Sequence, residues 1–199
     1  MTENMLRQRA AARRDAVIRE VLDRAWALMA RDGVAALSVR ELARELGVRQ
    51  QSLTYYFPSK QALLDALFAD GFGQLRPRLA AAGSAAASPV DRLVATVTEL
   101  LGYCTAHPAR YHLMLQRTVP GFTPSQASHQ IALDTLAVLL ERLADAGVTD
   151  PADVDIARGL INGLAAEQIA NDPGGDRFTR QATRALRALL AGLTTTSKE

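Results

Sequence analysis

The sequence predicts an all-α protein of about nine helices. Ala, Leu and Arg dominate its 199 residues, of which 48% are hydrophobic and only 5% aromatic, a composition that favours helices over sheet. Apolar residues recur at i, i+3 and i+4 in successive stretches, as on the buried face of an amphipathic helix. No stretch alternates with the period of two expected of a strand. We therefore expect helices joined by Gly-, Pro- and Ser-containing breaks.

The first predicted helix covers roughly residues 13–31. Its apolar face consists of Ile18, Val21, Leu22, Ala25, Leu28 and Met29. Trp26 is expected to pack at the edge of the domain that this helix helps to form. The start of the chain, up to the first turn of this helix, is basic, and we interpret it as a frayed tail, with insertion into a DNA minor groove as the alternative. Its cationic residues are Arg7, Arg9, Arg13 and Arg14.

Two short helices separated by a tight turn are predicted within residues 38–57. Ser38 begins the first of them, with Glu41 three residues later, a spacing typical of reciprocal capping. Its buried stripe consists of Val39, Leu42, Ala43 and Leu46. Gly47 provides the backbone freedom that ends this helix, and Val48 is expected to lie beneath the turn.

In the second short helix Leu53 and Phe57 are expected to face inward. The residues expected to face outward are Gln50, Gln51, Thr54 and Tyr55. Pro58 ends the helix, and Ser59 caps the one that follows. This arrangement is a helix-turn-helix, whose second helix is sized to enter a DNA major groove. An ordinary helical corner with a solvated polar face is the alternative interpretation.

The outward side chains suit DNA chemically. A Gln amide has a donor and an acceptor and can bind the edge of adenine, while hydroxyls and cations bind phosphates. We expect base edges to be read by Gln50, Gln51 and Thr54, with Ser52 close by. We expect the DNA backbone to be held by Ser38, Arg40, Arg49, Tyr55, Tyr56 and Lys60.

Charge is distributed unevenly along the chain. Residues 1–60 contain 11 Lys or Arg and 7 Asp or Glu, a net charge of +4, whereas residues 61–199 contain 12 and 14, a net charge of −2. The amino-terminal part therefore attracts polyanions. A single cysteine excludes an internal disulfide framework. There is no apolar run long enough to span a membrane and no secretion signal, so we expect a soluble, cytoplasmic protein without membrane contact.

The remaining helices are predicted from their apolar stripes and the breaks between them. The helix that follows Ser59 connects the two halves of the chain. A loop is expected near residues 80–89, and further breaks at residues 119–124 and 147–151. The predicted helices cover residues 59–76, 90–106, 108–115, 125–146, 152–170 and 177–193.

The last two predicted helices have the features of a subunit contact. One face of the helix at 152–170 is apolar, and another carries the small residues Gly159, Gly163, Ala166 and Ala170. A helix apolar on one side and small on the other is usually packed between its own core and a partner. We therefore predict a homodimer through the helices near 152–170 and 177–193, with burial inside one subunit as the alternative.

A small-molecule pocket is expected among the carboxy-terminal helices. The candidates are polar or pliable side chains in otherwise apolar helices, although each also fits plain packing. These candidate effector-binding residues are Tyr103, His107, Tyr111, Met114, Phe122 and Asn162. The shortage of aromatic residues favours an aliphatic or small ligand.

Enzymatic and metal sites have little support in the sequence. Cys104 and His107 lie three residues apart on one helix face, but His112 lies on a different face, and a metal site needs three or four ligands. The pair also lacks a third, orienting group and an oxyanion motif. No phosphate-binding glycine loop is present. We predict no catalytic residues, no metal and no cofactor.

Several elements in order make residues from about 15 to 75 resemble the amino-terminal domain of the TetR (tetracycline-repressor) family of bacterial transcription regulators. These elements are the Ala25–Met29 helix end with Asp32-Gly33, the segment Leu37–Ala43, Gly47-Val48, and Tyr55–Lys60 leading into Ala62–Leu64. The chain departs from the family at Thr54, where Tyr is frequent, and at Gln51, where a small residue or proline is frequent.

The resemblance implies a homodimeric, all-helical repressor. Three amino-terminal helices, expected at residues 15–75, would bind double-stranded DNA at a palindromic operator. Residues 76–199 would form a helical bundle that dimerises and binds an unknown small-molecule effector, which releases the DNA. A helical binding module without DNA, a regulator that senses only a protein partner, and an activator with the same fold are the alternatives that the sequence leaves open.

Overall fold

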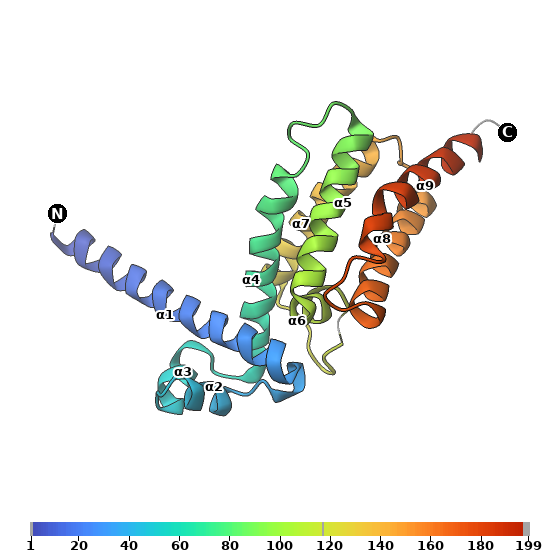
Figure 1. Cartoon of the computed structure of the whole chain (residues 1–199). Helices are drawn as coiled ribbons and strands as arrows, with labels where there is room; N and C mark the ends of the chain where they lie inside the picture. The colour runs from blue at the N-terminus through green and yellow to red at the C-terminus, as the bar shows by residue number, and fades with distance from the viewer. Residues whose placement is uncertain (1, 117, 197–199) are drawn as a thin grey trace.

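The chain is helical throughout the part that the structure, a computed structural model, describes, which is residues 2–116 and 118–196 (Figure 1). Nine α-helices and no strand occur in these two segments, which confirms the predicted all-α class. The helices are α1 (Thr2–Asp32), α2 (Val39–Glu45), α3 (Gln50–Tyr56), α4 (Lys60–Ala81), α5 (Pro89–Ala106), α6 (Pro108–Tyr111), α7 (Gln126–Asp145), α8 (Pro151–Asn171) and α9 (Ala182–Thr196). Shorter turns are η1 (Val34–Ala36), the π-helical η2 (His112–Gln116) and η3 (Thr179–Gln181). None of the described helices is long and apolar enough to cross a membrane.

Serine side chains start four of these helices. Each serine hydroxyl oxygen accepts a hydrogen bond from the backbone N–H three residues later, which satisfies one of the free amides of the first turn. The distances are 3.0 Å from Ser38 in α2, 3.1 Å from Ser59 in α4, 3.1 Å from Ser88 in α5 and 3.2 Å from Ser125 in α7. The sequence therefore sets these helix starts locally.

The turn between α2 and α3 differs from the prediction in two side chains. The Glu41 carboxylate binds Arg44 on the same helix, so the cap is Ser38 alone rather than a reciprocal pair. Val48 is 44% exposed and does not lie beneath the turn. Its backbone N–H closes the turn instead, donating to the Ala43 carbonyl at 3.0 Å, while Gly47 adopts a φ of 66°. Val48 is needed here for its amide and not for its side chain.

Two helices are longer than predicted. α1 begins at Thr2 and not near residue 13, so the described basic segment is helical and not a frayed tail. Ala, Arg and Gln are strong helix formers, and no Gly or Pro interrupts residues 2–12. α4 continues past residue 76, through Pro77, to Ala81. Leu75 and Leu79 on either side of this proline are buried, so packing offsets the hydrogen bond that proline removes.

Two hydrophobic cores meet on α4. The amino-terminal core joins α1, α2 and α3 to Leu63, Leu64 and Leu67 of α4. The bundle core begins one residue later, at Phe68, and joins the rest of α4 to the carboxy-terminal helices. The boundary predicted at residue 75 thus falls inside one continuous helix. Any tilt of α4 must move both cores.

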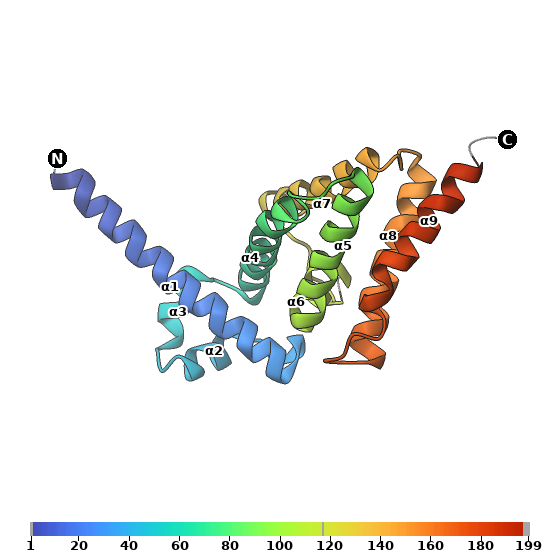
Figure 2. The same cartoon turned by 45° about the horizontal axis from the view of Figure 1, so that its top comes forward.

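The bundle is layered around α5. Helices α4 and α7 pack on one side of it, and α8 and α9 pack on the other, where they form the outer edge of the molecule (Figures 1 and 2). The buried Gln168 of α8 anchors the turn into α9, because its Oε1 accepts from the Phe178 and Thr179 amides at 2.8 and 3.2 Å. At the opposite end of the molecule, α1 extends beyond the rest of the protein, on the side where α3 lies.

Candidate nucleic-acid interface and effector cavities

α3 has a sharp division between buried and exposed side chains. Leu53 and Phe57 are 3% and 5% exposed and hold the helix on the amino-terminal core. All the residues predicted to read bases are exposed, namely Gln50, Gln51, Ser52 and Thr54. Tyr55 is 77% exposed, an unusual position for a large aromatic side chain in a protein without a partner. The orientation predicted for this helix is confirmed.

The polar side chains of α3 differ in which of their hydrogen-bonding groups remain free for a ligand. Within the described part of the chain, the side chains of Gln50 and Gln51 form no hydrogen bond, so both amides are available to a ligand. Thr54 Oγ1 donates to the Gln50 carbonyl at 3.0 Å, so its proton is used within the helix. Thr54 therefore offers a methyl group and an acceptor. The glutamines are the better base readers.

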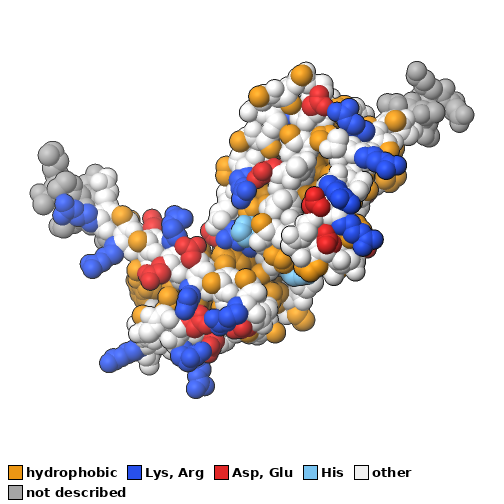
Figure 3. Space-filling model, in the orientation of Figure 1, with side chains coloured by type: hydrophobic (Ala, Val, Ile, Leu, Met, Phe, Trp, Pro, Cys, Tyr) orange, Lys and Arg blue, Asp and Glu red, His pale blue; other side chains and the backbone are white. Residues whose placement is uncertain are grey.

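Cationic and hydroxyl side chains surround α3. Arg40, Arg49 and Lys60 are exposed, and Tyr56 is half-buried with its ring edge-on to Tyr55 at 5.1 Å between centroids. The Ser38 hydroxyl oxygen accepts the cap hydrogen bond and keeps its own proton for donation. Figure 3 shows Lys and Arg side chains projecting from the lower edge of the molecule, where α2 and α3 lie. The residues predicted to hold the DNA backbone thus lie on α2 and α3, at the caps of these two helices, and at the start of α4.

The bundle contains a small apolar cavity of about 100 Å³ between α4, α5, α7 and α8. Most of its lining is leucine, and Thr135, Arg158 and Asn162 are its polar residues. Asn162 is the one residue of the six predicted effector contacts that lines it. A cavity of this size is well below the roughly 300–1,000 Å³ of usual ligand pockets.

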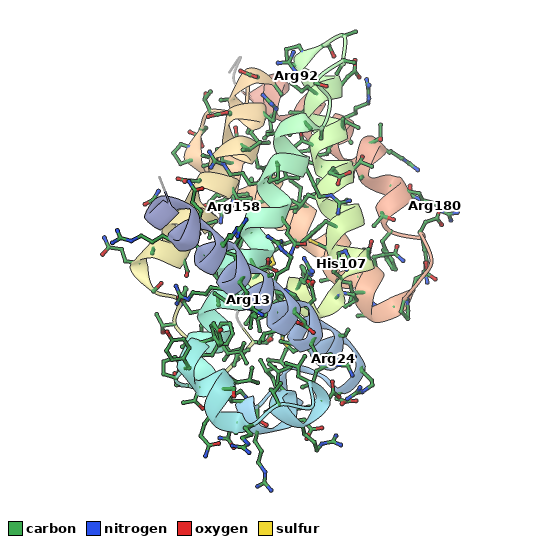
Figure 4. All side chains as sticks on the ribbon, turned by 90° about the vertical axis from the view of Figure 1, so that its left-hand side faces the viewer. Arg13, Arg24, Arg92, His107, Arg158 and Arg180 are labelled. Carbon is green, nitrogen blue, oxygen red and sulfur yellow. The ribbon has the colours of Figure 1, made fainter. Side chains whose placement is uncertain are left out.

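A larger groove of about 450 Å³ lies where the end of α1 meets α6. His107 lines this groove together with Trp26 and Arg110, and Figure 4 shows His107 near α1. The pKa of His107 is lowered, first by burial and then by the positive charges of Arg110 and Arg78. The groove therefore favours a neutral imidazole at neutral pH.

Tyr103 belongs to a polar network that joins four helices. Its hydroxyl donates to the Gly71 carbonyl at 3.0 Å and accepts from Arg110 Nη1 at 2.9 Å. Burial raises the pKa of Tyr103. The Arg110 guanidinium also lies over the Trp26 ring, 4.9 Å from its centroid, and the Trp26 indole N–H donates to Asp70 at 2.8 Å. This network, which we call the Arg110 network, joins α1 to α4, α5 and α6.

The other predicted effector residues serve packing or internal hydrogen bonds. The Tyr111 hydroxyl donates to the Asn162 carbonyl at 3.4 Å and accepts from Gln116 at 3.1 Å. Met114 is buried against Gly71, and Phe122 packs edge-on to Phe68 with 6.0 Å between ring centroids. The six residues therefore do not gather around either of the two cavities.

Cys104 is buried in the bundle core, and burial raises its pKa to about 12. Its thiol is protonated at neutral pH, so it is neither a nucleophile nor a ready metal ligand. Among the described residues there is no group of three or more His, Cys, Asp or Glu that could hold a metal ion.

The outer face of α8 carries several small and apolar residues that are uncovered in the single chain. Ile156 is 53% exposed, and Gly159, Gly163 and Ala170 are exposed on the same side of the helix. A Cβ atom added to Gly159 or Gly163 would meet nothing within 4 Å. The opposite face carries the buried Ala157 and Ile161. The two faces predicted for this helix are thus both present.

The sequence alone does not predict two features of these sites. One is the Arg110 network, whose members are far apart in the sequence. The other is a hollow of about 500 Å³ between α1 and α3, lined by Arg13, Arg14, Tyr55 and Tyr56. The arginines and tyrosines are recognisable in the sequence, but they lie about 40 residues apart, and only the packing of α1 beside α3 brings them to one hollow.

Comparison with known proteins agrees with this geometry. Residues 21–67 match the family model for bacterial regulatory proteins of the tetR family. The HTH-type transcriptional regulators Rv1816 of Mycobacterium tuberculosis (strain ATCC 25618 / H37Rv) and Mb1846 of Mycobacterium bovis (strain ATCC BAA-935 / AF2122/97) are each 28% identical over 158 residues. These alignments cover 73% of the chain and 65% of each relative, so the chain spans slightly less than two thirds of their length.

Solved structures share the fold over nearly the whole chain. A protein of unknown function from Rhodococcus sp. RHA1 is 26% identical with a TM-score of 0.72, and the match covers 88% of this chain and 94% of that one. The transcriptional regulator FadR from Bacillus subtilis, solved in complex with stearoyl-CoA, is 19% identical with a TM-score of 0.64, covering 86% and 97%.

Proposed function

We propose that this chain, which belongs to the TetR family of bacterial transcriptional regulators, acts as a homodimeric repressor released from a palindromic operator by a small-molecule effector. In this proposal residues 15–75 bind DNA, and residues 76–199 dimerise and bind the effector. The observation that carries it is α3, where two glutamines without internal partners lie among exposed cations and hydroxyls.

α3 enters the major groove and the surrounding residues hold the phosphates. Gln50 and Gln51 bind base edges, most favourably adenine, through paired donor and acceptor groups. Thr54 contributes an apolar methyl contact of the kind that recognises thymine. Arg40, Arg49 and Lys60 neutralise phosphates, which supplies affinity but no sequence preference. The protein must share a compartment with the chromosome, in agreement with the predicted cytoplasmic location.

The exposed apolar face of α8, together with α9, forms the dimer contact. Small residues allow close approach of a second helix, and Ile156 gains burial there. Two subunits then present their α3 helices about 34 Å apart, or a multiple of this spacing, which requires an operator with two inverted half-sites.

The leucine-lined cavity next to Arg158 is the effector site. Its lining suits an aliphatic chain, and Arg158 and Asn162 suit an acidic or polar end group. The stearoyl-CoA complex of the FadR neighbour supports this ligand class. Because the cavity holds only about 100 Å³, a longer chain enters only if α4 and α7 separate.

Separation of α4 from α7 explains release from DNA. α4 carries both cores, and the Arg110 network attaches α1 to the same helices. A ligand that expands the bundle therefore tilts the amino-terminal core and changes the distance between the two α3 helices. Only a ligand that prefers this DNA-incompetent form shifts the equilibrium.

The decisive experiment sequences the genomic fragments that the purified protein retains and then measures operator binding of two variants. Gln51→Ala removes a base reader and should lose about 1–3 kcal/mol on the operator, with a relaxed sequence preference. Lys60→Ala removes a phosphate-binding cation and should weaken operator and random DNA alike, lowering the salt slope by about one.

The two variants control for each other, since both residues are exposed. Equal losses on operator and random DNA for Gln51→Ala would show that α3 does not read sequence. A wild-type protein that retains no DNA fragment at low salt would refute the DNA-binding function itself.

A further inference from the structure

The hollow between α1 and α3 has the chemistry of a phosphate site. Its lining consists of Ala11, Arg13, Arg14, Val17, Tyr55 and Tyr56, with two cations and two phenol groups and no acidic side chain. Guanidinium groups bind phosphate through paired N–H donors, and phenol hydroxyls are also donors. Ala11 and Val17 add apolar surface against which a deoxyribose can pack. The volume of about 500 Å³ is ample for a sugar-phosphate unit.

The cations of this hollow are not used elsewhere in the protein. In the segments that the structure describes, Arg9, Arg13 and Arg14 are exposed and belong to no ion pair, although Asp15 is adjacent in sequence. By contrast, Arg24 and Arg31 further along α1 bind Glu45. Arg9, Arg13 and Arg14 lie toward the end of α1 that leaves the body of the protein.

The cationic side of α1 continues outward beyond the hollow. Arg9 precedes Arg13 by four residues and therefore lies on the same side of α1, one turn further from the body. Residues 2–14 of α1, which we call the basic arm, contain four arginines and one glutamate. At about 1.5 Å per residue the arm continues for roughly 18 Å beyond Arg14. Figure 1 shows that it projects past the amino-terminal core on the side of α3.

We propose that the basic arm is a second DNA-binding element, which holds the phosphate backbone of the base pairs flanking the half-site read by α3. Arg13 and Arg14 bind a phosphate in the hollow beside Tyr55, and Arg9 binds the next phosphates outward. Charge complementarity and direct continuity with α3 through Tyr55 and Tyr56 identify DNA as the occupant. This inference rests on the proposed function and adds a DNA-binding surface outside the helix-turn-helix.

The test compares two DNA fragments. One is the operator trimmed to its two half-sites, and the other carries about ten additional base pairs, one helical turn, on each side. The tested variant is Arg9→Ala/Arg13→Ala, whose substitutions keep α1 helical because Ala is the best helix former. The matched control is Arg19→Ala, an exposed arginine of the same helix that follows Val17 by two residues and so points to nearly the opposite side.

The double variant should bind the flanked fragment about tenfold or more weakly than the wild type. Its salt slope should fall by about 0.9 for each phosphate that the protein no longer neutralises. It should equal the wild type on the trimmed fragment, and Arg19→Ala should equal the wild type on both. The weakening should be the same for A·T-rich and G·C-rich flanks, because phosphates carry no sequence information.

Three results would contradict the proposal that the basic arm binds DNA phosphates outside the half-site. They are unchanged binding of the double variant to the flanked fragment, equal weakening on both fragments, and a weakening that depends on the flanking sequence, which would indicate insertion into a groove. If the arm binds a protein partner instead of DNA, the double variant should bind the flanked fragment as the wild type does. Failure of the proposed function is seen separately, because the wild type would then bind neither fragment.

Discussion

Polar side chains on the α3 surface and in the bundle interior differ in exposure and in internal hydrogen bonding. On α3, Gln50, Gln51 and Tyr55 are exposed and the two glutamine amides form no internal hydrogen bond. In the bundle, Tyr103 and Tyr111 are each 2% exposed, and both hydroxyls are bonded to neighbouring helices. The first set is available to a ligand, whereas the second holds the protein together.

This difference affects how a binding site is recognised. A buried polar group must be hydrogen-bonded inside the protein, so its presence in an apolar helix is no sign of a ligand. An exposed large aromatic side chain beside unpaired amides has no such internal explanation. The apolar cavity near Arg158, which we propose as the effector site, is lined by only one of the six polar or pliable residues that the sequence predicts to bind an effector.

The largest effect is expected from Gly163→Glu on the outer face of α8. A Cβ atom added at Gly163 meets nothing within 4 Å in the single chain, so the fold should persist, but the carboxylate would be forced into the proposed dimer interface. Dissociation of the dimer leaves one DNA-binding head where two were linked, and operator affinity should fall about 10²- to 10⁴-fold. Sedimentation and operator titration measure the two consequences.

Gly102→Glu is the matched control, since Gly102 is also an exposed helical glycine with open space around it, but on α5. It should remain dimeric and bind DNA normally. A Gly163→Glu protein that stays dimeric would show that α8 is not the dimer interface.

An intermediate effect is expected from filling the leucine-lined cavity with Leu136→Trp. Fatty acids and their CoA esters of graded chain length serve as probes, and an active one should weaken operator binding of the wild type about 5- to 150-fold. The variant should bind the operator normally and lose this response, because the indole occupies the cavity. Leu133→Trp changes a 44% exposed leucine of the same helix and should respond like the wild type.

Two outcomes would remove the cavity from the mechanism. Either no chain length acts on the wild type, which excludes an aliphatic effector, or Leu136→Trp keeps the full response, which places the effector elsewhere.

The smallest effect separates the two kinds of tyrosine directly. Tyr103→Phe leaves Arg110 without one of its acceptors and should lower stability by about 1 kcal/mol, seen as a lower Tm, without changing sequence preference on DNA. Tyr55→Phe removes an exposed hydroxyl and should leave Tm unchanged while weakening DNA binding. The reverse pattern would contradict the division between structural and DNA-binding tyrosines.

Local signals are sufficient for most helix starts and for the orientation of α3, but not for the start of α1, the end of α4 or the start of α9, which is Ala182 and not residue 177. Four helices are capped by a serine that accepts a hydrogen bond from the amide three residues later, namely by Ser38, Ser59, Ser88 and Ser125. The buried Leu53 and Phe57 determine which side of α3 faces the core. The errors concern groups whose role depends on other segments. The apolar side chain of Val48 predicts a buried position, whereas its amide closes the turn, and the basic start predicts a tail, whereas it continues α1.

The sequence by itself determined the all-helical class, the turn at Gly47 and the exposed chemistry of α3, because capping, helix periodicity and glycine conformation act over a few residues. Only the tertiary structure decided which groups meet across the bundle: Trp26 with Asp70 and Arg110, the leucines around Arg158, and Arg13 with Tyr55. These contacts join residues up to 84 positions apart, from Trp26 to Arg110. Their geometry depends on how whole helices pack, which is set by the sum of many apolar contacts and by no single motif.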